Sequence, residues 1–334
     1  MKAVILDGSA ATDAVGTQVR EALVSQLRER GWNTEEIVLH DKKIEACSGC
    51  FFCWIRTPGI CTLDDDNRVI AEKVMSGDLL IYLTPVTFGG YSSILKGMVD
   101  HLIPNISPFF QSINGETHHK QRYKTYPDLM TIGWMDEPDP EAEALFRYLT
   151  KRNSLNFFSL QQYSRVLAGE QSIAESEEKI REWLDDSERG VPTPSVSVTE
   201  IEKLLEPTFA GGVATQRALL LVGSPRMQKS VSNALGQHLF QRLASHGVQT
   251  ETVFLHNAVR SADAINSLLV KIDDSDLVTL AFPLYVDSLP APVTQVLEKV
   301  RGHRLHHSSS SQPIFCAICN CGFPEAIHTT SALG

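Results

Sequence analysis

The sequence predicts an α/β protein made of two doubly wound parallel sheets in tandem, the second cut short after its fourth strand. The first observation is an internal repeat. Residues 27–40 read LRERGWNTEEIVLH and residues 243–256 read LASHGVQTETVFLH, with leucine, glycine, Thr-Glu and Leu-His at matching places. The other two observations are the alternation of apolar runs with amphipathic segments and the place where the second half ends.

The alternation of strand and helix patterns is clearest in the first half. Val19, Ala22, Leu23 and Leu27 mark one face of a helix, and Gly31 stops it. A further helix is expected over residues 176–184. Short apolar runs predict strands at 3–6, 36–39, 79–83, 129–134 and 163–167. Apolar strands that alternate with amphipathic helices predict a parallel sheet covered on both faces.

The second half repeats this pattern but is shorter. Strands are expected at 219–222, 252–255, 278–282 and 314–318, and the sequence ends at Gly334 without room for a fifth strand and its helix. We therefore expect a truncated sheet whose edge is exposed or covered by another subunit, which favours a homo-oligomer, or alternatively a chain that is an incomplete product. The expected domains are 1–190, with a cysteine-rich insertion, and 216–334, joined by a linker at 191–215.

Composition narrows the class of protein. The 334 residues are 43% hydrophobic and 21% charged, and the formal net charge of −10 argues against a nucleic-acid partner. The apolar run near the N-terminus is too short for a signal peptide, and no run approaches the length of a membrane helix. We therefore expect a cytoplasmic protein with no membrane partner. In a reducing compartment, the seven cysteines are expected to be thiols or metal ligands.

The loops that follow the first strand of each half suit a phosphate. Ligands of open parallel sheets bind beyond the carboxyl ends of the strands, and the amides at a helix N-terminus favour anions. The second-half loop, GSPRMQKSVSNAL at 223–235, offers Ser224, Arg226, Ser230 and Ser232. The first-half loop, GSAATDAVGT at 8–17, has hydroxyl groups but no basic residue, and it carries Asp13. A serine-rich helix cap explains either loop as well.

The loops after the third and fourth strands suit a flat heterocycle. The third strands lead into PVTFGGYSS at 85–93 and PLYVDSLPAP at 283–292, which combine a proline, an aromatic residue and small residues. Such loops present backbone amides and a ring face to a ligand, although each also reads as a proline-punctuated turn. The fourth strand of the second half leads into NCGFPE at 320–325. The first-half counterpart, GWMDEPDPE at 133–141, is more acidic. No G-x-G-x-x-G dinucleotide fingerprint is present.

Together these motifs resemble those of the flavodoxin-like NAD(P)H-dependent FMN reductase superfamily. The residues that carry the resemblance are GSPRMQKSVS and PLYVDSLP in the second half and TPVTFGGYSSILKGMVDH at 84–101 in the first. The resemblance implies two flavodoxin-like domains, bound FMN, NAD(P)H as electron donor, and hydride transfer to a small acceptor such as flavin or quinone. It assigns no catalytic side chain, because the cofactor carries the chemistry.

The resemblance also implies which residues contact the cofactor. For the second half these are Ser224, Arg226, Ser230 and Ser232 around the phosphate, and Pro283, Leu284, Tyr285, Val286, Asn320, Cys321 and Gly322 around the ring. For the first half they are Ser9, Thr12, Thr17, Pro85, Val86, Thr87 and Phe88.

The first half also contains a cysteine cluster, CSGCFFCWIRTPGIC at 47–61. Cys47, Cys50, Cys53 and Cys61 have the spacing C-x2-C-x2-C-x7-C, which suits a [4Fe-4S] cluster or zinc. The spacing resembles that of iron–sulfur flavoproteins in the same superfamily, which implies an electron carrier as the alternative function. Free thiols that shape a loop, or a cofactor-free thiol sensor or scaffold, remain open.

Aromatic and histidine residues complete the sequence predictions. Phe51, Phe52 and Trp54 are expected to cover the flavin ring, make a dimer contact or pack locally. The pairs His118-His119 and His306-His307 are expected on the solvated surface.

Overall fold

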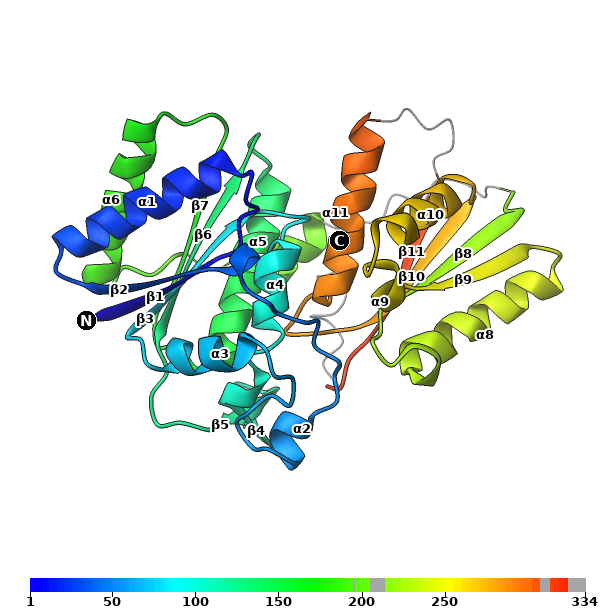
Figure 1. Cartoon of the computed structure of the whole chain (residues 1–334), viewed down its shortest axis with the longest axis horizontal. Helices are drawn as coiled ribbons and strands as arrows, with labels where there is room; N and C mark the ends of the chain where they lie inside the picture. Colours follow the sequence, from blue (N-terminus) through cyan, green and yellow to red (C-terminus); the bar gives the residue numbers. More distant parts are fainter. Residues whose placement is uncertain (195, 205–213, 307–312, 324–334) are drawn as a thin grey trace. The chain divides into compact units, whose positions relative to one another are not determined.

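The computed structural model describes residues 1–194, 196–204, 214–306 and 313–323. It divides the chain into two compact units, coloured along the sequence in Figure 1. The first unit comprises Met1–Glu45 and Cys50–Leu204, and the second comprises Ala46–Gly49 and Leu205–Gly334. Among the described residues, no helix has both the length and the apolar character needed to cross a membrane.

The first unit is built on a five-stranded parallel sheet. Its strands are β1 (Lys2–Asp7), β2 (Asn33–Val38), β3 (Leu79–Pro85), β6 (Asp128–Met135) and β7 (Gln162–Ala168). Their order is β2-β1-β3-β6-β7, which is the strand order of flavodoxin. The fold class predicted from the alternation of strands and helices is confirmed, and each of the five expected strands is present.

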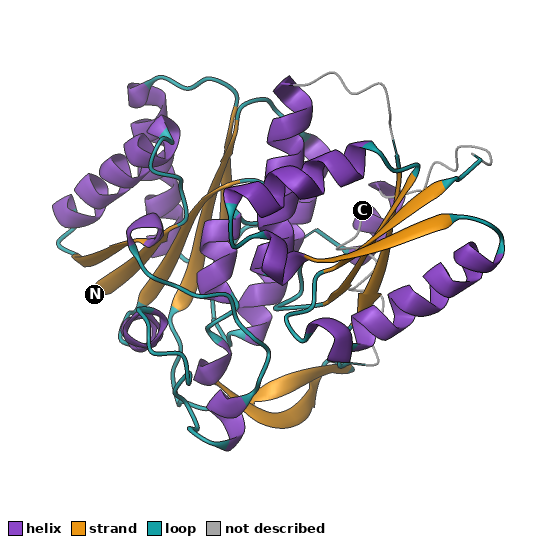
Figure 2. Ribbon diagram, turned by 45° about the vertical axis from the view of Figure 1, so that its right-hand side comes forward, coloured by secondary structure: helices purple, strands orange, loops and turns teal. Residues whose placement is uncertain are grey.

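Helices cover both faces of this sheet (Figures 1 and 2). The helices of the first unit are α1 (Ala14–Glu29), α2 (Phe52–Ile55), α3 (Asn67–Met75), α4 (Ser93–Val99), α5 (Pro140–Asn156), α6 (Ile173–Glu188) and α7 (Val198–Leu204), with short 3-10 turns η1 (Leu39–Asp41) and η2 (Ile103–Asn105). The main apolar core lies where α1 and α6 pack on the sheet, and it contains Leu23, Ile81 and Ile180, none of them exposed.

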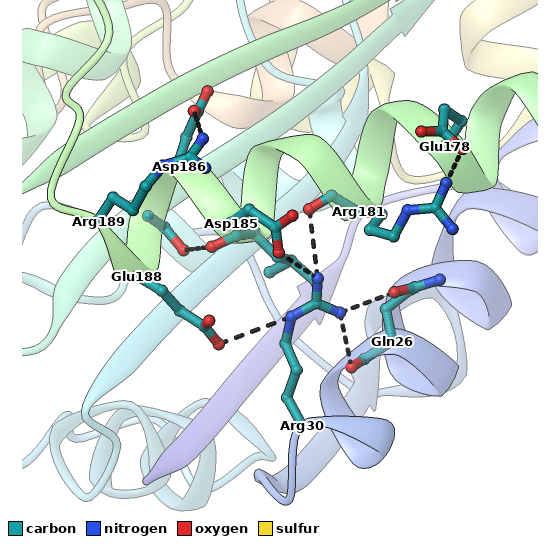
Figure 3. Close-up of polar contacts among 10 residues, drawn as sticks. Gln26, Arg30, Glu178, Arg181, Asp185, Asp186, Glu188 and Arg189 are labelled. Carbon is teal, nitrogen blue, oxygen red and sulfur yellow. Dashed lines mark hydrogen bonds and ion pairs between the residues drawn. The ribbon is translucent and has the colours of Figure 1, made fainter.

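Polar contacts also join α1 to α6, at the C-terminal end of α1 (Figure 3). The Arg30 guanidinium lies 2.6 Å from an Asp185 oxygen and 3.6 Å from a Glu188 oxygen. The same guanidinium donates to the backbone carbonyl and the side-chain oxygen of Gln26. Arg30 therefore links two helices that are distant in the sequence.

An antiparallel hairpin, β4 (Ile106–Ile113) with β5 (Glu116–Gln121), was not expected from the sequence. Its turn is Asn114-Gly115, and both residues have positive φ. Asn-Gly is a strong hairpin signal that the sequence reading passed over. The surface expectation for His118 is wrong, because the hairpin folds back and leaves only 3% of His118 exposed, with Asn156 and Glu116 as hydrogen-bond partners.

The second unit repeats the first four strands of this topology. Its strands are β8 (Arg217–Val222), β9 (Gln249–Phe254), β10 (Leu277–Pro283) and β11 (Ile314–Asn320), in the order β11-β10-β8-β9. In the part of the unit that the structure describes, β11 forms one edge, and residues 324–334 lie outside that part. Of the second histidine pair, His306 is exposed as expected, and His307 is not among the described residues.

The helices of the second unit also lie on both faces of its sheet. They are α8 (Val231–Ser245), α9 (Leu255–Ala258), α10 (Ala262–Asp273) and α11 (Ala291–His306), with a 3-10 turn η3 (Met227–Lys229) after β8. The expected strands 36–39 and 252–255 were each one residue too long at the end. Leu39 begins η1 and Leu255 begins α9. The strands end one residue earlier because the adjacent strands β1 and β8 end opposite Val38 and Phe254.

Candidate cofactor site

The loop between β8 and α8 holds the predicted phosphate-binding residues of the second unit. Gly223 must be a glycine, because an added Cβ would lie 2.4 Å from Val293 Cγ2. Ser224 is buried, and its hydroxyl lies 3.4 Å from the Arg226 backbone nitrogen. Ser230 caps α8 by accepting the Asn233 N–H at 3.1 Å. Arg226 itself is exposed.

The loops after β8, β10 and β11 of the second unit are joined by hydrogen bonds. The Ser232 hydroxyl donates to Asn320 Oδ1 at 2.6 Å, and the Leu284 N–H donates to the Asn320 carbonyl at 2.8 Å. Three residues that the resemblance assigned to three separate loops are therefore brought together at one edge of the sheet. Pro283 ends β10, and Gly322 lies just beyond β11.

Both units make the same tight turn after their third strand. In the second unit, Tyr285 and Ser288 exchange backbone hydrogen bonds at 3.0 Å, and Val286 has φ 45°. In the first unit, Thr87 and Gly90 exchange bonds at 2.8 and 2.9 Å, around Phe88 at φ 49°. A positive φ is costly for a valine or a phenylalanine, and such strain gathers at ligand-binding sites.

The corresponding loops of the first unit are also joined, but by a different set of contacts. Val86 donates its N–H to the Trp134 carbonyl at 2.8 Å, which matches the bond between Leu284 and Asn320 in the second unit. Ser9 is 1% exposed, and its N–H donates to Asp7 Oδ1 at 2.8 Å. Pro85 ends β3.

The first-unit loop differs from the second most at the start of its helix. Asp13 caps α1, and its Oδ1 accepts the Gly16 N–H at 2.9 Å. Thr12 is exposed, and the Thr17 hydroxyl donates to the Asp13 carbonyl at 3.2 Å. Two of the predicted phosphate contacts are therefore neighbours of Asp13, Thr12 in the sequence and Thr17 through a hydrogen bond to its backbone.

A phosphate group fits the second-unit loop and not the first-unit loop. Residues 223–235 contain no acidic residue, and they carry Arg226 and buried serine hydroxyls beside a helix N-terminus. In the first unit the helix N-terminus already holds the Asp13 carboxylate. The residues present therefore suit the FMN phosphate in the second unit better than in the first.

The cysteine segment contains a thiol–imidazole pair. Cys61 Sγ lies 3.8 Å from His101 Nδ1, and His101 Nε2 lies 2.6 Å from the Glu45 carbonyl. Burial opposes both charged forms, but the hydrogen bonds prevail, so the pKa of Cys61 is lowered and that of His101 is raised. Burial raises the pKa of Cys53 to about 11. The sequence reading missed His101, which is 40 residues from Cys61.

The four cysteines do not lie in one unit. Cys50, Cys53 and Cys61 belong to the first unit, whereas Cys47 is grouped with the second. Within the described ranges, no three or more His, Cys, Asp or Glu side chains are arranged to hold a metal ion. Metal binding by this set stays a prediction.

Trp54 fixes the cysteine segment to its surroundings. Its indole N–H lies 3.0 Å from the Ile103 carbonyl and 3.1 Å from the Ile106 carbonyl. Its ring stacks on Phe51 and tilts against His119. Phe52 lies under the Arg56 guanidinium, with 3.9 Å to the ring centre. The sequence left three roles open for these aromatic residues: covering the flavin ring, making a dimer contact or packing locally. The contacts described here are local packing.

A cavity of about 770 Å³ lies in the first unit between α3 and the segment that follows β5. Arg68, Glu72, Asn105 and Lys124 line it, and Cys61 lies at its wall. None of the predicted FMN contacts lines this cavity.

Comparison with known proteins identifies relatives of part of the chain. Residues 1–120 match the family model of NADPH-dependent FMN reductase. An iron–sulfur flavoprotein of Methanocaldococcus jannaschii is 38% identical over 105 residues, which cover 31% of this chain and 53% of the relative. An FMN-dependent NADPH-azoreductase of Staphylococcus aureus is 31% identical over 104 residues, which cover 30% of this chain and 52% of the relative. The chain thus spans about half the length of these relatives.

Among solved structures, an NAD(P)H:quinone oxidoreductase from Methanothermobacter marburgensis is 15% identical, with a TM-score of 0.42 over 55% of this chain and 96% of the other. That similarity adds nothing to the topology described above. The sequence resemblance, by contrast, is confirmed where the family model matches. That match is limited to residues 1–120, which resemble the NADPH-dependent FMN reductase family.

Proposed function

We propose that this protein is a flavin-dependent oxidoreductase that binds FMN in the second unit and takes electrons from NAD(P)H. The single observation that carries the proposal is the joining of the β8–α8, β10–α11 and β11 loops through Ser232, Leu284 and Asn320. These contacts fix a phosphate-compatible loop next to a loop suited to a ring. The family match of residues 1–120, nearly all in the first unit, and the names of the relatives support flavin chemistry in the chain without choosing between its units.

Each part of the second unit then has a role. Ser224, Ser230 and Arg226 would bind the phosphate through hydroxyl groups, a guanidinium and the N-terminal amides of α8. The turn from Tyr285 to Ser288 would orient the ring through its backbone. When bound, FMN supplies the hydride-transfer chemistry, and the protein positions the ring. The acceptor in this proposal is a small molecule such as a flavin or a quinone.

FMN titration of the full chain, followed by quenching of flavin fluorescence, tests this proposal. We expect Arg226→Ala to weaken FMN binding about tenfold or more, because a charge-assisted bond to phosphate is lost. Lys229→Ala is the matched control, since Lys229 is an exposed base in the same loop. Wild-type protein that does not quench FMN fluorescence would refute the proposal, as would equal effects of the two substitutions.

A second candidate function is that of an iron–sulfur flavoprotein that carries electrons. It is favoured by the cysteine spacing and by the names of the relatives of 28–38% identity. Anaerobically purified protein should then contain about four iron atoms and about four sulfides per chain. Cys53→Ser should abolish both, while Cys316→Ser, a change outside the cysteine segment, should leave them unaltered. Iron-free protein from anaerobic preparation would eliminate this candidate.

A further inference from the structure

The two units place different side chains at the same point of the fold. In the second unit the N-cap of the first helix is Ser230, a neutral hydroxyl. In the first unit the N-cap of the first helix is Asp13, a carboxylate. The preceding residues match, because Gly8-Ser9 and Gly223-Ser224 both follow the first strand. The difference therefore lies where an anion is attracted by the helix dipole.

Both oxygens of the Asp13 carboxylate are engaged within the first unit. Oδ1 accepts the Gly16 N–H at 2.9 Å, and Oδ2 accepts the indole N–H of Trp134 at 3.0 Å. The carboxylate thus already occupies the amide end of the helix, and a second loop of the same unit holds it there. Any ligand phosphate at this point would have to displace a bonded anion or lie beside it.

The backbone of α1 near this cap packs closely against Ser9 and Trp134. A Cβ added to Gly16 would lie 2.5 Å from Ser9 Cβ and 2.9 Å from Trp134 Cζ2. Ser9 is only 1% exposed, and Trp134 only 4%. The β1–α1 loop is therefore packed against the Trp134 indole.

The charges near this loop also oppose a phosphate. Asp7 is fully buried beside it, and Arg20 Nη1 forms an ion pair with Asp7 at 2.7 Å. Asp7 and Arg20 together contribute no net charge, so Asp13 leaves the loop negative. A phosphate carries a charge of about −1.5 to −2 at neutral pH, so the two would repel.

We propose that Asp13 is a specificity determinant that substitutes for the ligand phosphate in the first unit, so that the chain binds one FMN, in its second unit. This inference rests on the proposed function and assigns the cofactor to one of two similar units. Of the two sets of FMN contacts that the resemblance implies, it retains the second and rejects the phosphate contacts of Ser9, Thr12 and Thr17.

The stoichiometry of FMN binding to the full chain tests the inference, measured by calorimetric titration. Wild type should bind one FMN, and Asp13→Ser, which keeps a good helix cap, should bind two. Asp139→Ser is the matched control, because Asp139 caps α5 of the same unit through its own side chain, and it should still bind one. Two FMN per wild-type chain, or one per chain of the Asp13→Ser variant, overturns the inference. Wild type that binds none refutes the proposed function instead.

Moving the carboxylate into the second unit provides an independent readout. Ser230→Asp should weaken FMN binding about tenfold or more but change riboflavin binding less than about threefold, because riboflavin lacks the phosphate. Ser261→Asp is the control, since Ser261 caps α10 in the same way. Asp is a good N-cap, so both variants retain a helix cap. Equal loss of FMN and riboflavin, or unchanged FMN binding, contradicts the inference.

Discussion

The buried ion pair between Lys96 and Asp100 should control the stability of the first unit. Both side chains are 2% exposed and lie one helical turn apart, at the end of α4. The N-cap of α4 is Ser92, whose hydroxyl accepts the Leu95 N–H at 3.2 Å and donates to the Gly8 carbonyl at 2.7 Å. The pair therefore stabilises the helix that supports two of the site loops.

Replacing Lys96 by Met keeps an apolar stem of similar length but leaves the Asp100 carboxylate buried without its ammonium partner. Removal of one member of a buried pair costs about 3–5 kcal/mol, whereas replacement of both by apolar residues is often neutral. We expect Lys96→Met to lower the free energy of unfolding by about 3 kcal/mol or more. The double variant Lys96→Met/Asp100→Leu should recover about 2 kcal/mol of that loss.

Urea denaturation followed by tryptophan fluorescence measures this effect in the first unit alone. The four tryptophans, at positions 32, 54, 134 and 183, all lie in that unit. The midpoint and slope of the transition then give the free energy of unfolding. A loss below about 1 kcal/mol for Lys96→Met, or a double variant no more stable than the single one, would refute the reasoning.

Two further predictions concern partly exposed ion pairs, measured by the same denaturation assay. Arg30→Ala should cost about 1 kcal/mol because it loses several contacts to α6 (Figure 3), while Arg181→Ala, from an exposed pair, should cost less than about 0.5 kcal/mol. Equal costs would contradict this. Hydrogen bonds from Lys2 and Lys73 lower the pKa of Glu35 below its ordinary 4.5. The Glu35 carboxylate therefore stabilises the folded state above pH 4.5, and this stabilisation is lost as the pH falls through the lowered pKa. The difference in free energy of unfolding between wild type and Glu35→Gln should therefore be largest at neutral pH and decrease in acid. A difference that does not change with pH would contradict this prediction.

Much of the fold could be predicted because its signals are local. Apolar runs of strand length and helix faces at a 3.6-residue period depend on neighbours in the sequence, and the repeat showed that the pattern occurs twice. The Asn114-Gly115 turn is an equally local signal, which predicts the hairpin between β4 and β5. The burial of His118 was not predictable, because it depends on Asn156 in a separate helix.

Some features of the candidate site could also be predicted from the sequence, and others could not. The loops, their hydroxyl groups and the presence of Asp13 in place of a base were visible in the sequence. The sequence did not show that the Trp134 indole, 121 residues away, holds the Asp13 carboxylate at the helix N-terminus. Likewise, it did not show the bond from Ser232 to Asn320 or the pairing of Cys61 with His101.

The sequence by itself therefore determined the class, the repeat and the candidate ligand loops, since each follows from residue type and spacing. Only the tertiary structure showed which of those loops holds a carboxylate at its helix N-terminus and which is joined to its neighbouring loops by a serine hydroxyl. The physical reason is that parallel strands bring distant loops to one edge of the sheet, and there a carboxylate meets donors that no local pattern reveals.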